Sequence, residues 1–427
     1  MNWIRKLLQL LRRDSPSLLV FGRLGASALA LISAPIVARA IGPEGRGDTA
    51  AAIALFYITP ILLAIGIPME VRRLSATSDA KRVLRAARIL CILALPLSIA
   101  AAIVFGQTIF LELDPTTRMV AIIGVSLSPL MMSWSCDVSV LVAHERYRGV
   151  MVMQLAQPGI YVIIVIALSL LRIASPATVL IASLCGTTTT FIVGVYLTRT
   201  SVLGPHVPLA SLMKNAVRFA GSSIAEAASS RLDQVLVLPL IGSFQAGIYS
   251  VAVTVAAVPL SFGQALGASF FRPIARAEGI NRRDLQAAAL RSASALALMS
   301  IPLMAIAIYF GLPVLFGEEY ASSVPIAFVS LLGTAGMMTA YVCSMALGAA
   351  GRGTVMSVAQ ISSLILGIAL LYVLGPIYGA VGAAVASSIS YFTLLVILVC
   401  ALRIPFELVI PRRHDFADSI RRLFSGR

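Results

Sequence analysis

Charged side chains are scarce in this 427-residue chain, in which Asp, Glu, Lys and Arg together make up only 12%. A soluble globular domain holds about 25% charged residues. The apolar fraction is correspondingly high, at 59%, and the mean hydropathy is +0.95. A water-soluble fold cannot bury this much apolar surface, so the sequence predicts a protein whose solvent is lipid.

Cysteine and histidine are also rare, with five and three residues. The cysteines fall inside apolar runs without a Cys-x-x-Cys spacing, so we interpret them as small buried hydrophobic residues. The histidines, His144, His206 and His414, are isolated in polar links. This pattern predicts no metal site and no cofactor. A phosphate-binding loop of the Walker type is also missing, which argues against a primary pump.

The net charge of +15 first suggests a nucleic-acid-binding protein. The basic residues, however, are distributed between apolar segments, where they are expected to orient the chain in a membrane. We therefore expect the lipid bilayer, and no nucleic acid, as a partner.

Twelve apolar segments are each long enough to cross a bilayer, which needs about 20 residues per helix. They are residues 17–41, 49–70, 86–106, 119–143, 150–171, 177–198, 217–240, 246–270, 290–315, 323–348, 354–374 and 378–402. The prediction is an all-α polytopic membrane protein with about twelve transmembrane helices and short links, the first being an external loop at residues 42–48.

Charge distribution predicts the orientation of these helices. With both termini in the cytoplasm, the basic clusters at residues 72–88, 272–291 and 403–427 all lie inside, as the positive-inside rule requires. Omitting the segment 217–240, which contains charged residues, would reverse the second half and place its basic clusters outside. Residues 1–14 combine apolar and basic residues at helical spacing, which predicts an amphipathic helix at the membrane interface.

An internal repeat divides the chain. The segments AIGPEGRGDTA and LIGSFQAGIYS share Ile-Gly and a later Gly at an offset of 200 residues, and Arg72 and Arg272 match at the same offset. We predict an N-terminal six-helix half at residues 15–200, a C-terminal half at 201–402 and a basic cytoplasmic tail at 403–427. Because six spans are an even number, the pseudo-two-fold axis would run along the membrane normal, as in transporters with parallel repeats.

Several segments also resemble a known family. They read VARAIGPEGRGDTAAAIALF, IGIPMEVRRLSA, SSRLDQVLVLPLIGSFQAGIYSVAVTVAAVP, SIPLMAIAIYFGLPVLFGEEYASS and YGAVGAAVASSIS. In this order they are similar to the motifs of the oligosaccharide flippases, the polysaccharide biosynthesis (O-antigen-type) transporters of the multidrug/oligosaccharidyl-lipid/polysaccharide exporter superfamily. Arg46-Gly47-Asp48 departs from the pattern, since many members carry an aromatic residue between the glycines. Twelve spans match this family better than the related lipid II flippases, which typically have fourteen.

The resemblance implies a function. Members of this family move undecaprenyl-diphosphate-linked oligosaccharides from the cytoplasmic to the outer leaflet of the bacterial plasma membrane. We therefore expect a non-enzymatic flippase that works by alternating access on a lipid-linked glycan, with a proton or a sodium ion as the candidate coupling ion.

Two arginines are candidates for binding the substrate diphosphate. Arg23 lies a few residues into the first span and Arg231 lies deeper in the seventh, and a guanidinium inside a membrane segment is a functional candidate by default. The alternative for Arg23 is that its side chain reaches the cytoplasmic interface.

Three acidic residues complete the candidate substrate cavity: Asp233, Glu226 and Asp137. Asp233 and Glu226 flank Arg231 and could take up protons during transport, or could form a buried structural network with it. Asp137, in the fourth span, could bind a proton or an ion, or could hydrogen-bond nearby serines.

Two other classes of function remain open. A multidrug or small-molecule antiporter of the same superfamily would have the same architecture, but such proteins favour acidic and aromatic cavities. A membrane glycosyltransferase or polysaccharide polymerase needs a sizeable loop, whereas the longest external link, QTIFLELDPTTR, is short.

Overall fold

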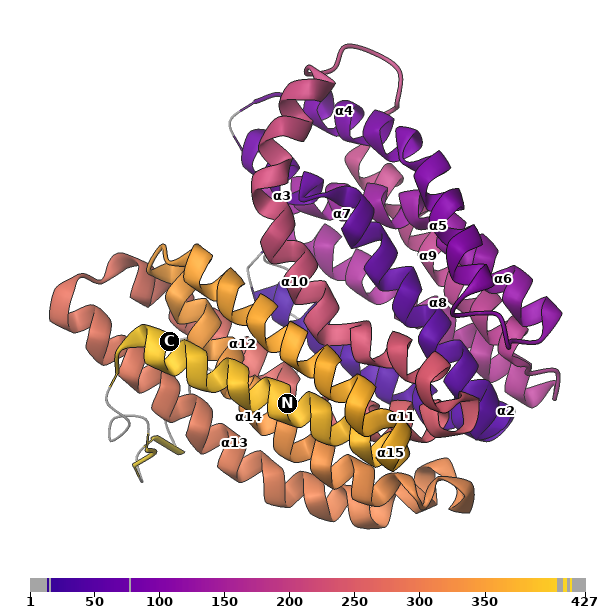
Figure 1. Ribbon diagram of the computed structural model, residues 1–427. Helices are drawn as coiled ribbons and strands as arrows, with labels where there is room; N and C mark the ends of the chain where they lie inside the picture. The colour runs from indigo at the N-terminus through magenta and orange to yellow at the C-terminus, as the bar shows by residue number, and fades with distance from the viewer. Residues whose placement is uncertain (1–13, 15–16, 77, 405–409, 413–414, 417–427) are drawn as a thin grey trace, which may run out of the picture. The chain divides into compact units, whose positions relative to one another are not determined.

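The computed structural model describes residues 14, 17–76, 78–404, 410–412 and 415–416. All regular elements of this described part are helices (Figure 1). The predicted amphipathic helix at 1–14 lies outside the described residues except for Asp14, as does most of the tail at 403–427.

The helices follow one another along the chain with short connections. They are α2 (Ser17–Ala64), α3 (Ile67–Ser75), α4 (Ala80–Leu93), α5 (Leu95–Gln107), α6 (Pro115–Ser126), α7 (Ser128–Ala143), α8 (Tyr147–Leu170), α9 (Pro176–Thr198), α10 (Leu209–Ile241), α11 (Ser243–Ala256), α12 (Val258–Arg276), α13 (Gly279–Phe316), η1 (Glu318–Tyr320), α14 (Ser323–Ala349) and α15 (Gly353–Leu402).

Six of the described helices are long and apolar enough to cross a membrane by themselves, and up to nine spans result if each bent helix pair counts as one. Two of the six, α2 and α15, have 48 and 50 residues, so each is long enough for two crossings. Eleven of the twelve predicted segments coincide with a helix, a bent pair or one arm of a kinked helix, and the segment 49–70 covers the later arm of α2 and the start of α3. The all-α polytopic architecture is therefore confirmed.

Prolines explain the three bent pairs. The helix axes change direction by 40° between α4 and α5, by 41° between α6 and α7, and by 43° between α11 and α12. In each case a proline is the second residue of the later helix: Pro96, Pro129 and Pro259. A proline has no N–H to donate to the preceding turn and its ring clashes with that turn, so the helix bends there.

Glycines with a positive φ produce the kinks in the two longest helices. Gly42 has φ 70° and Gly379 has φ 59°, conformations that other residues rarely adopt. The predicted loop at residues 42–48 is wrong, because all of these residues except the kinked Gly42 continue the helical geometry of α2. The helix persists because a single glycine is sufficient to redirect the chain.

The two arms of α15 lie side by side as a hairpin. Ser363 Oγ donates to the Ser390 carbonyl at 2.6 Å, and Ser390 Oγ donates to the Ser363 carbonyl at 2.8 Å. At the base of the hairpin, Arg352 donates to the carbonyl of Ala401 at 2.6 Å. Small residues allow this close approach of backbones and hydroxyl groups, as is common between membrane helices.

The chain forms two compact units, residues 1–239 and 240–427. Unit 1 therefore contains α2 to α9 and nearly all of α10, and unit 2 contains the remaining helices. This division lies after the boundary expected from the repeat, between residues 200 and 201, because α10 packs against helices of unit 1. The repeat boundary itself stays a prediction.

The contact of α10 with unit 1 is close. Leu212 and Ala216 are buried in one apolar cluster with Ile67 of α3 and Val83 of α4. Gly66, before α3, has φ 79°, and a Cβ atom placed there would be 2.4 Å from the Ala216 carbonyl oxygen. Only glycine permits this approach, so Gly66 fixes the position of α3 against α10.

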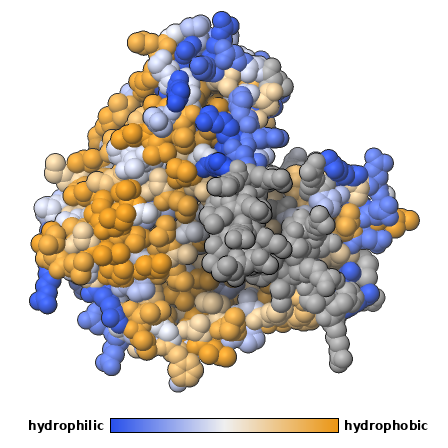
Figure 2. Space-filling view, turned by 180° about the vertical axis from the view of Figure 1, so that it is seen from behind, coloured by the Kyte–Doolittle hydropathy of each residue, from blue (hydrophilic) through white to orange (hydrophobic). Residues whose placement is uncertain are grey.

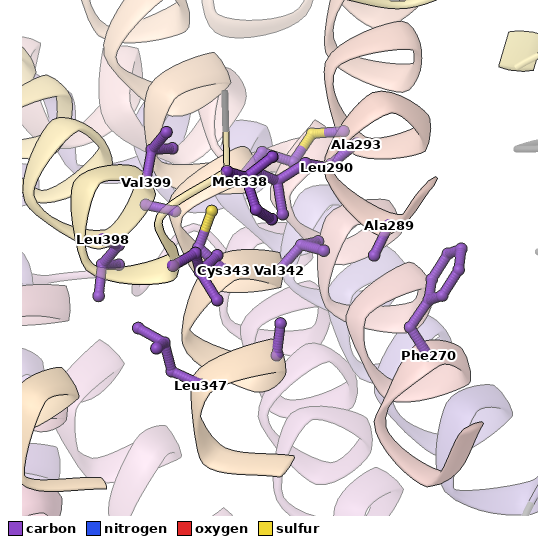
Figure 3. Close-up of a cluster of buried hydrophobic side chains, with 14 of the residues drawn as sticks. Phe270, Ala289, Leu290, Ala293, Met338, Val342, Cys343, Leu347, Leu398 and Val399 are labelled. Atoms are coloured by element: carbon purple, nitrogen blue, oxygen red, sulfur yellow. The ribbon is translucent and has the colours of Figure 1, made fainter. Parts of the chain in front are cut away.

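The core of unit 2 is built around α14. Figure 3 shows Met338, Val342 and Cys343 of α14 between Leu398 and Val399 of α15 on one side and residues of α13 on the other. All of these side chains are buried and apolar, and they belong to one cluster with Leu266 and Phe270 of α12.

The surface differs from that of a soluble protein. Figure 2 shows broad hydrophobic areas, interrupted by smaller groups of hydrophilic residues. Large apolar side chains are exposed on many helices, including Leu170 at 79% and Leu303 at 70%. Such an apolar surface is stable in contact with lipid and would aggregate in water.

Candidate functional site

Arg231, a predicted substrate-binding residue, lies over the aromatic ring of Tyr57. Its guanidinium carbon is 5.3 Å from the ring centroid, within the range of a cation–π interaction. Tyr57 belongs to α2 and is partly buried, whereas Arg231 belongs to α10 and is exposed. A guanidinium group over an aromatic ring keeps its positive charge and its N–H groups, through which it can bind an anion. The arrangement can therefore hold a phosphate or a carboxylate.

Polar side chains of α8 and α9 extend this contact. The Tyr57 hydroxyl is within hydrogen-bonding range of the Gln157 side chain. Gln157 Nε2 in turn donates to Thr187 Oγ1 of α9 at 3.3 Å. A polar chain thus runs from α10 through α2 and α8 to α9, inside unit 1.

A second arginine and tyrosine lie along the same helices. The guanidinium of Arg46, on the later arm of α2, is near enough to act electrostatically on the phenol of Tyr161 of α8, which also interacts with Tyr57. Arg46 is partly buried, and its Nε atom is buried without a hydrogen-bond partner in the described part of the chain. The sequence placed Arg46 in an external loop, where solvation of the side chain was the default expectation and contact with a departing diphosphate the alternative.

Arg23, the other predicted cation, lies on the earlier arm of α2 and is exposed. Its neighbour Gly22 packs against the side chain of Gln154 of α8, where a Cβ atom would be 2.1 Å from Gln154 Oε1. Arg23 therefore lies next to the helix that carries Gln157 and Tyr161, but the substrate role of its side chain stays a prediction.

The acidic neighbours of Arg231 are described only in part. Asp233 is partly buried, and its Oδ1 accepts a hydrogen bond from the Gln234 amide at 2.8 Å. The side chain of Glu226 lies outside the described residues. Proton uptake by these two carboxylates stays a prediction.

Asp137 of α7 forms a buried ion pair with Arg88 of α4. Arg88 donates to Asp137 Oδ1 at 2.8 Å, and the two side chains are 5% and 0% exposed. Thr198 of α9 donates to the same oxygen at 3.0 Å, and Arg88 also donates to the carbonyl of Thr200. An arginine and a threonine thus bind Asp137, in place of the nearby serines that the sequence suggested. Arg88, which the sequence assigned to a cytoplasmic basic cluster, is instead 4% exposed as a whole residue.

This ion pair joins three helices at the end of unit 1 where α9 finishes. Among the residues that the structure describes, neither the second oxygen of Asp137, Oδ2, nor Nε of Arg88 has a hydrogen-bond partner, and both atoms are buried. A buried carboxylate needs a countercharge, and Arg88 supplies it. The role predicted for Asp137 in substrate or ion binding stays open.

Metal binding receives no support from the described part of the chain, where no group of three His, Cys, Asp or Glu residues is close enough to hold an ion. A small pocket in unit 1 is lined mostly by apolar residues, such as Phe56, Leu127 and Met131, together with Thr187.

The sequence analysis missed Tyr57, Gln154, Gln157 and Tyr161. The one available signal was the spacing of the three α8 residues, three and four positions apart, which places them on one helix face. Their proximity to α2, α9 and α10 required the tertiary structure.

Comparison with known proteins gives two kinds of match. The family described as "Polysaccharide biosynthesis protein" matches residues 14–271. Among curated proteins, sequence comparison gives no significant match. Solved structures that share the fold include the lipid II flippase MurJ in an inward closed conformation, at a TM-score of 0.77 and 13% identity, with 96% of this chain and 92% of that chain covered.

Two multidrug transporters are also similar in structure. One is an inward-facing multidrug resistance MATE family transporter of the MOP superfamily, at a TM-score of 0.63 and 12% identity, covering 94% of this chain and 95% of that one. The other is the MATE multidrug transporter DinF-BH, at a TM-score of 0.62 and 16% identity, covering 91% of this chain and 96% of that one. At these identities the likeness concerns the two-halved transporter fold.

The family match spans more than half of the chain and includes the first three of the five motif segments described above. This chain therefore belongs to the polysaccharide biosynthesis protein family, and it has the fold of the MurJ and MATE membrane transporters.

Proposed function

We propose that this protein moves an anionic polyprenyl-diphosphate-linked oligosaccharide across the bacterial cytoplasmic membrane by alternating access. Membership of the polysaccharide biosynthesis family supports a glycan substrate. The observation that carries the proposal is the Arg231–Tyr57 contact, because it holds a permanently charged guanidinium group over an aromatic ring of α2, on a helix predicted to span the membrane.

The physical need for such a group is clear. A diphosphate that crosses about 30 Å of hydrocarbon loses its water, which costs many kcal/mol for a bare anion. Arginine binds phosphate oxygens through two parallel N–H donors and stays charged at every physiological pH. Arg231, with Arg46 and Arg23 on α2, would replace part of the lost hydration, while the polyprenyl tail stays in the lipid.

A multidrug antiporter is the second candidate, because the fold is shared with MATE transporters and the site contains two tyrosines. The charges that act on those tyrosines favour the glycan carrier. The guanidinium group of Arg231 acts on Tyr57, and that of Arg46 acts on Tyr161. Both positive charges attract a diphosphate and repel a cationic drug.

Substitution of Arg231 tests the proposal. Arg231→Lys keeps the charge but loses the planar pair of donors, so we expect partial export, whereas Arg231→Ala is expected to lower export at least about tenfold. The matched control is Arg218→Ala, which removes an exposed arginine from the same helix and should leave export unchanged.

Glycan export and the amount of protein in the membrane are measured together. Lost export at normal abundance supports a substrate role for Arg231. Parallel loss of both would show that Arg231 stabilises the protein instead, and normal export in Arg231→Ala would refute the role.

Dissipating the proton gradient and the sodium gradient separately tests the proposed coupling ion.

A further inference from the structure

One face of α8 carries a row of polar side chains through the membrane-spanning part of unit 1. Gln154, Gln157 and Tyr161 are spaced by three and four residues, so they project from the same side of the helix. The rest of α8 beyond its first turn is almost entirely apolar. Polar side chains in a transmembrane helix are costly, and they are typically found where they serve a binding or transport path.

The neighbours of this row are also suited to bind a polar ligand. Tyr57 is within hydrogen-bonding range of Gln157, and Tyr161 interacts with both Tyr57 and Arg46. Tyr57, Gln157 and Tyr161 are each partly exposed, so the row is not sealed in the core. Gln154 Oε1 is buried and has no hydrogen-bond partner among the described residues, so one acceptor of the row is left unsatisfied inside unit 1.

The row is long enough to bind more than one sugar ring. At a rise of 1.5 Å per residue, Gln154 and Tyr161 are about 10 Å apart along the α8 axis. The amide groups offer both donors and acceptors, as sugar hydroxyl groups do. The two phenol rings offer aromatic faces against which the C–H face of a sugar ring can pack, while their hydroxyl groups bind at the edge.

We propose that this row, formed by Gln154, Gln157 and Tyr161 of α8 with Tyr57 of α2, binds the sugar chain of the substrate next to the diphosphate at Arg231. The proposal rests on the proposed function and adds the site that recognises the glycan. Because a site built to hydrogen-bond hydroxyl groups rejects a ligand that lacks them, this row would let the protein distinguish the glycosylated lipid from the bare lipid diphosphate.

The main alternative is that the row only holds helices together, through the 3.3 Å hydrogen bond between Gln157 and Thr187. Two substitutions separate these roles. Gln157→Leu removes both the amide and the hydrogen bond, whereas Thr187→Val removes the same hydrogen bond and leaves the amide in place.

The experiment measures binding to the full-length protein in lipid nanodiscs. The two probes are undecaprenyl diphosphate and the lipid-linked oligosaccharides purified from membranes of cells that make the protein. For the unsubstituted protein we expect the glycosylated probe to bind at least about tenfold more tightly, which corresponds to one or two net hydrogen bonds. Gln157→Leu should bring the two affinities close together, Thr187→Val should preserve the difference, and Arg231→Ala should weaken both probes alike.

Each outcome separates this inference from the proposed function. If the unsubstituted protein binds both probes equally, or if Thr187→Val removes the preference as fully as Gln157→Leu does, the sugar site is refuted while the diphosphate carrier stands. If the unsubstituted protein binds neither probe, the proposed function itself is refuted. Thermal unfolding of each variant in the same nanodiscs identifies any that have lost their fold, and for those Tyr57→Phe provides a milder test by the same affinity ratio.

Discussion

Removing one partner of the Arg88–Asp137 ion pair is expected to cost about 3–5 kcal/mol of unfolding free energy, because a charge is then left buried alone. The estimate needs no reduction for solvent screening, since the two side chains are only 5% and 0% exposed. Asp137→Asn strands the guanidinium of Arg88, and Arg88→Met strands the carboxylate. The double variant Arg88→Met/Asp137→Leu leaves no buried charge, so it should recover most of the loss.

The assay is equilibrium unfolding in mixed micelles, with both single variants and the double variant forming a thermodynamic cycle. The control is Arg82→Met on the same helix, α4. Arg82 pairs with Asp79 at 3.8 Å, but both side chains are more than half exposed, so this change should cost less than about 1 kcal/mol. Both pairs join an arginine to an aspartate, so the difference between their unfolding free energies reports the effect of burial.

Two results would refute the structural reading of Asp137. A loss below about 1 kcal/mol in Asp137→Asn would show that the pair does not stabilise unit 1. A double variant that is stable but transports no glycan would show that the ion pair also acts in transport, as the sequence analysis considered for Asp137.

Further predictions concern topology, backbone strain and pH. In a variant without native cysteines, Gln107→Cys should react with an impermeant reagent on intact spheroplasts and Ser78→Cys should not; the reverse pattern would overturn the orientation. Gly242→Ala should cost about 1–3 kcal/mol because φ is 83° there, whereas Gly311→Ala, in a regular helix with equally open surroundings, should stabilise by about 1 kcal/mol in the same unfolding assay. The pKa of Asp114 is lowered, first by the hydrogen bond from the Thr116 hydroxyl and also by backbone N–H donors of α6. The stabilisation of α6 by the Asp114 carboxylate is therefore present above the unfolded pKa of about 3.9 and is lost as pH falls through the lower folded pKa. Amide exchange in the first turn of α6 should rise over that range in the unsubstituted protein but not in Asp114→Asn.

Hydrophobic periodicity was sufficient to locate the helices, because each membrane-spanning segment must satisfy its own backbone hydrogen bonds. The segment 217–240 was placed correctly within α10 although it contains charged residues. The turn of α2 was not foreseen, since residues 43–48 contain polar and glycine residues that are typical of loops. In the structure the helix continues through them, because Gly42 alone accommodates the change of direction.

The site was predicted less completely than the fold. Arg231 could be recognised as a cation in an apolar segment, but its aromatic neighbour Tyr57 lies on a helix far away in sequence. Arg88 was grouped with the cytoplasmic arginines, since its burial depends on how α4 packs against α7 and α9. Long-range pairing of this kind leaves no periodic signal in the sequence.

The hairpin of α15 also has a consequence for how the protein enters the membrane during synthesis. None of its 50 residues is charged, and the arginines that flank it, Arg352 and Arg403, are brought to one side by the hydrogen bond from Arg352 to Ala401. Carrying one charge across a potential of 100 mV involves about 2.3 kcal/mol, and this hairpin carries none. Its insertion therefore requires no work against the electric field. The two arms of α15 can therefore insert into the membrane together, as one hairpin.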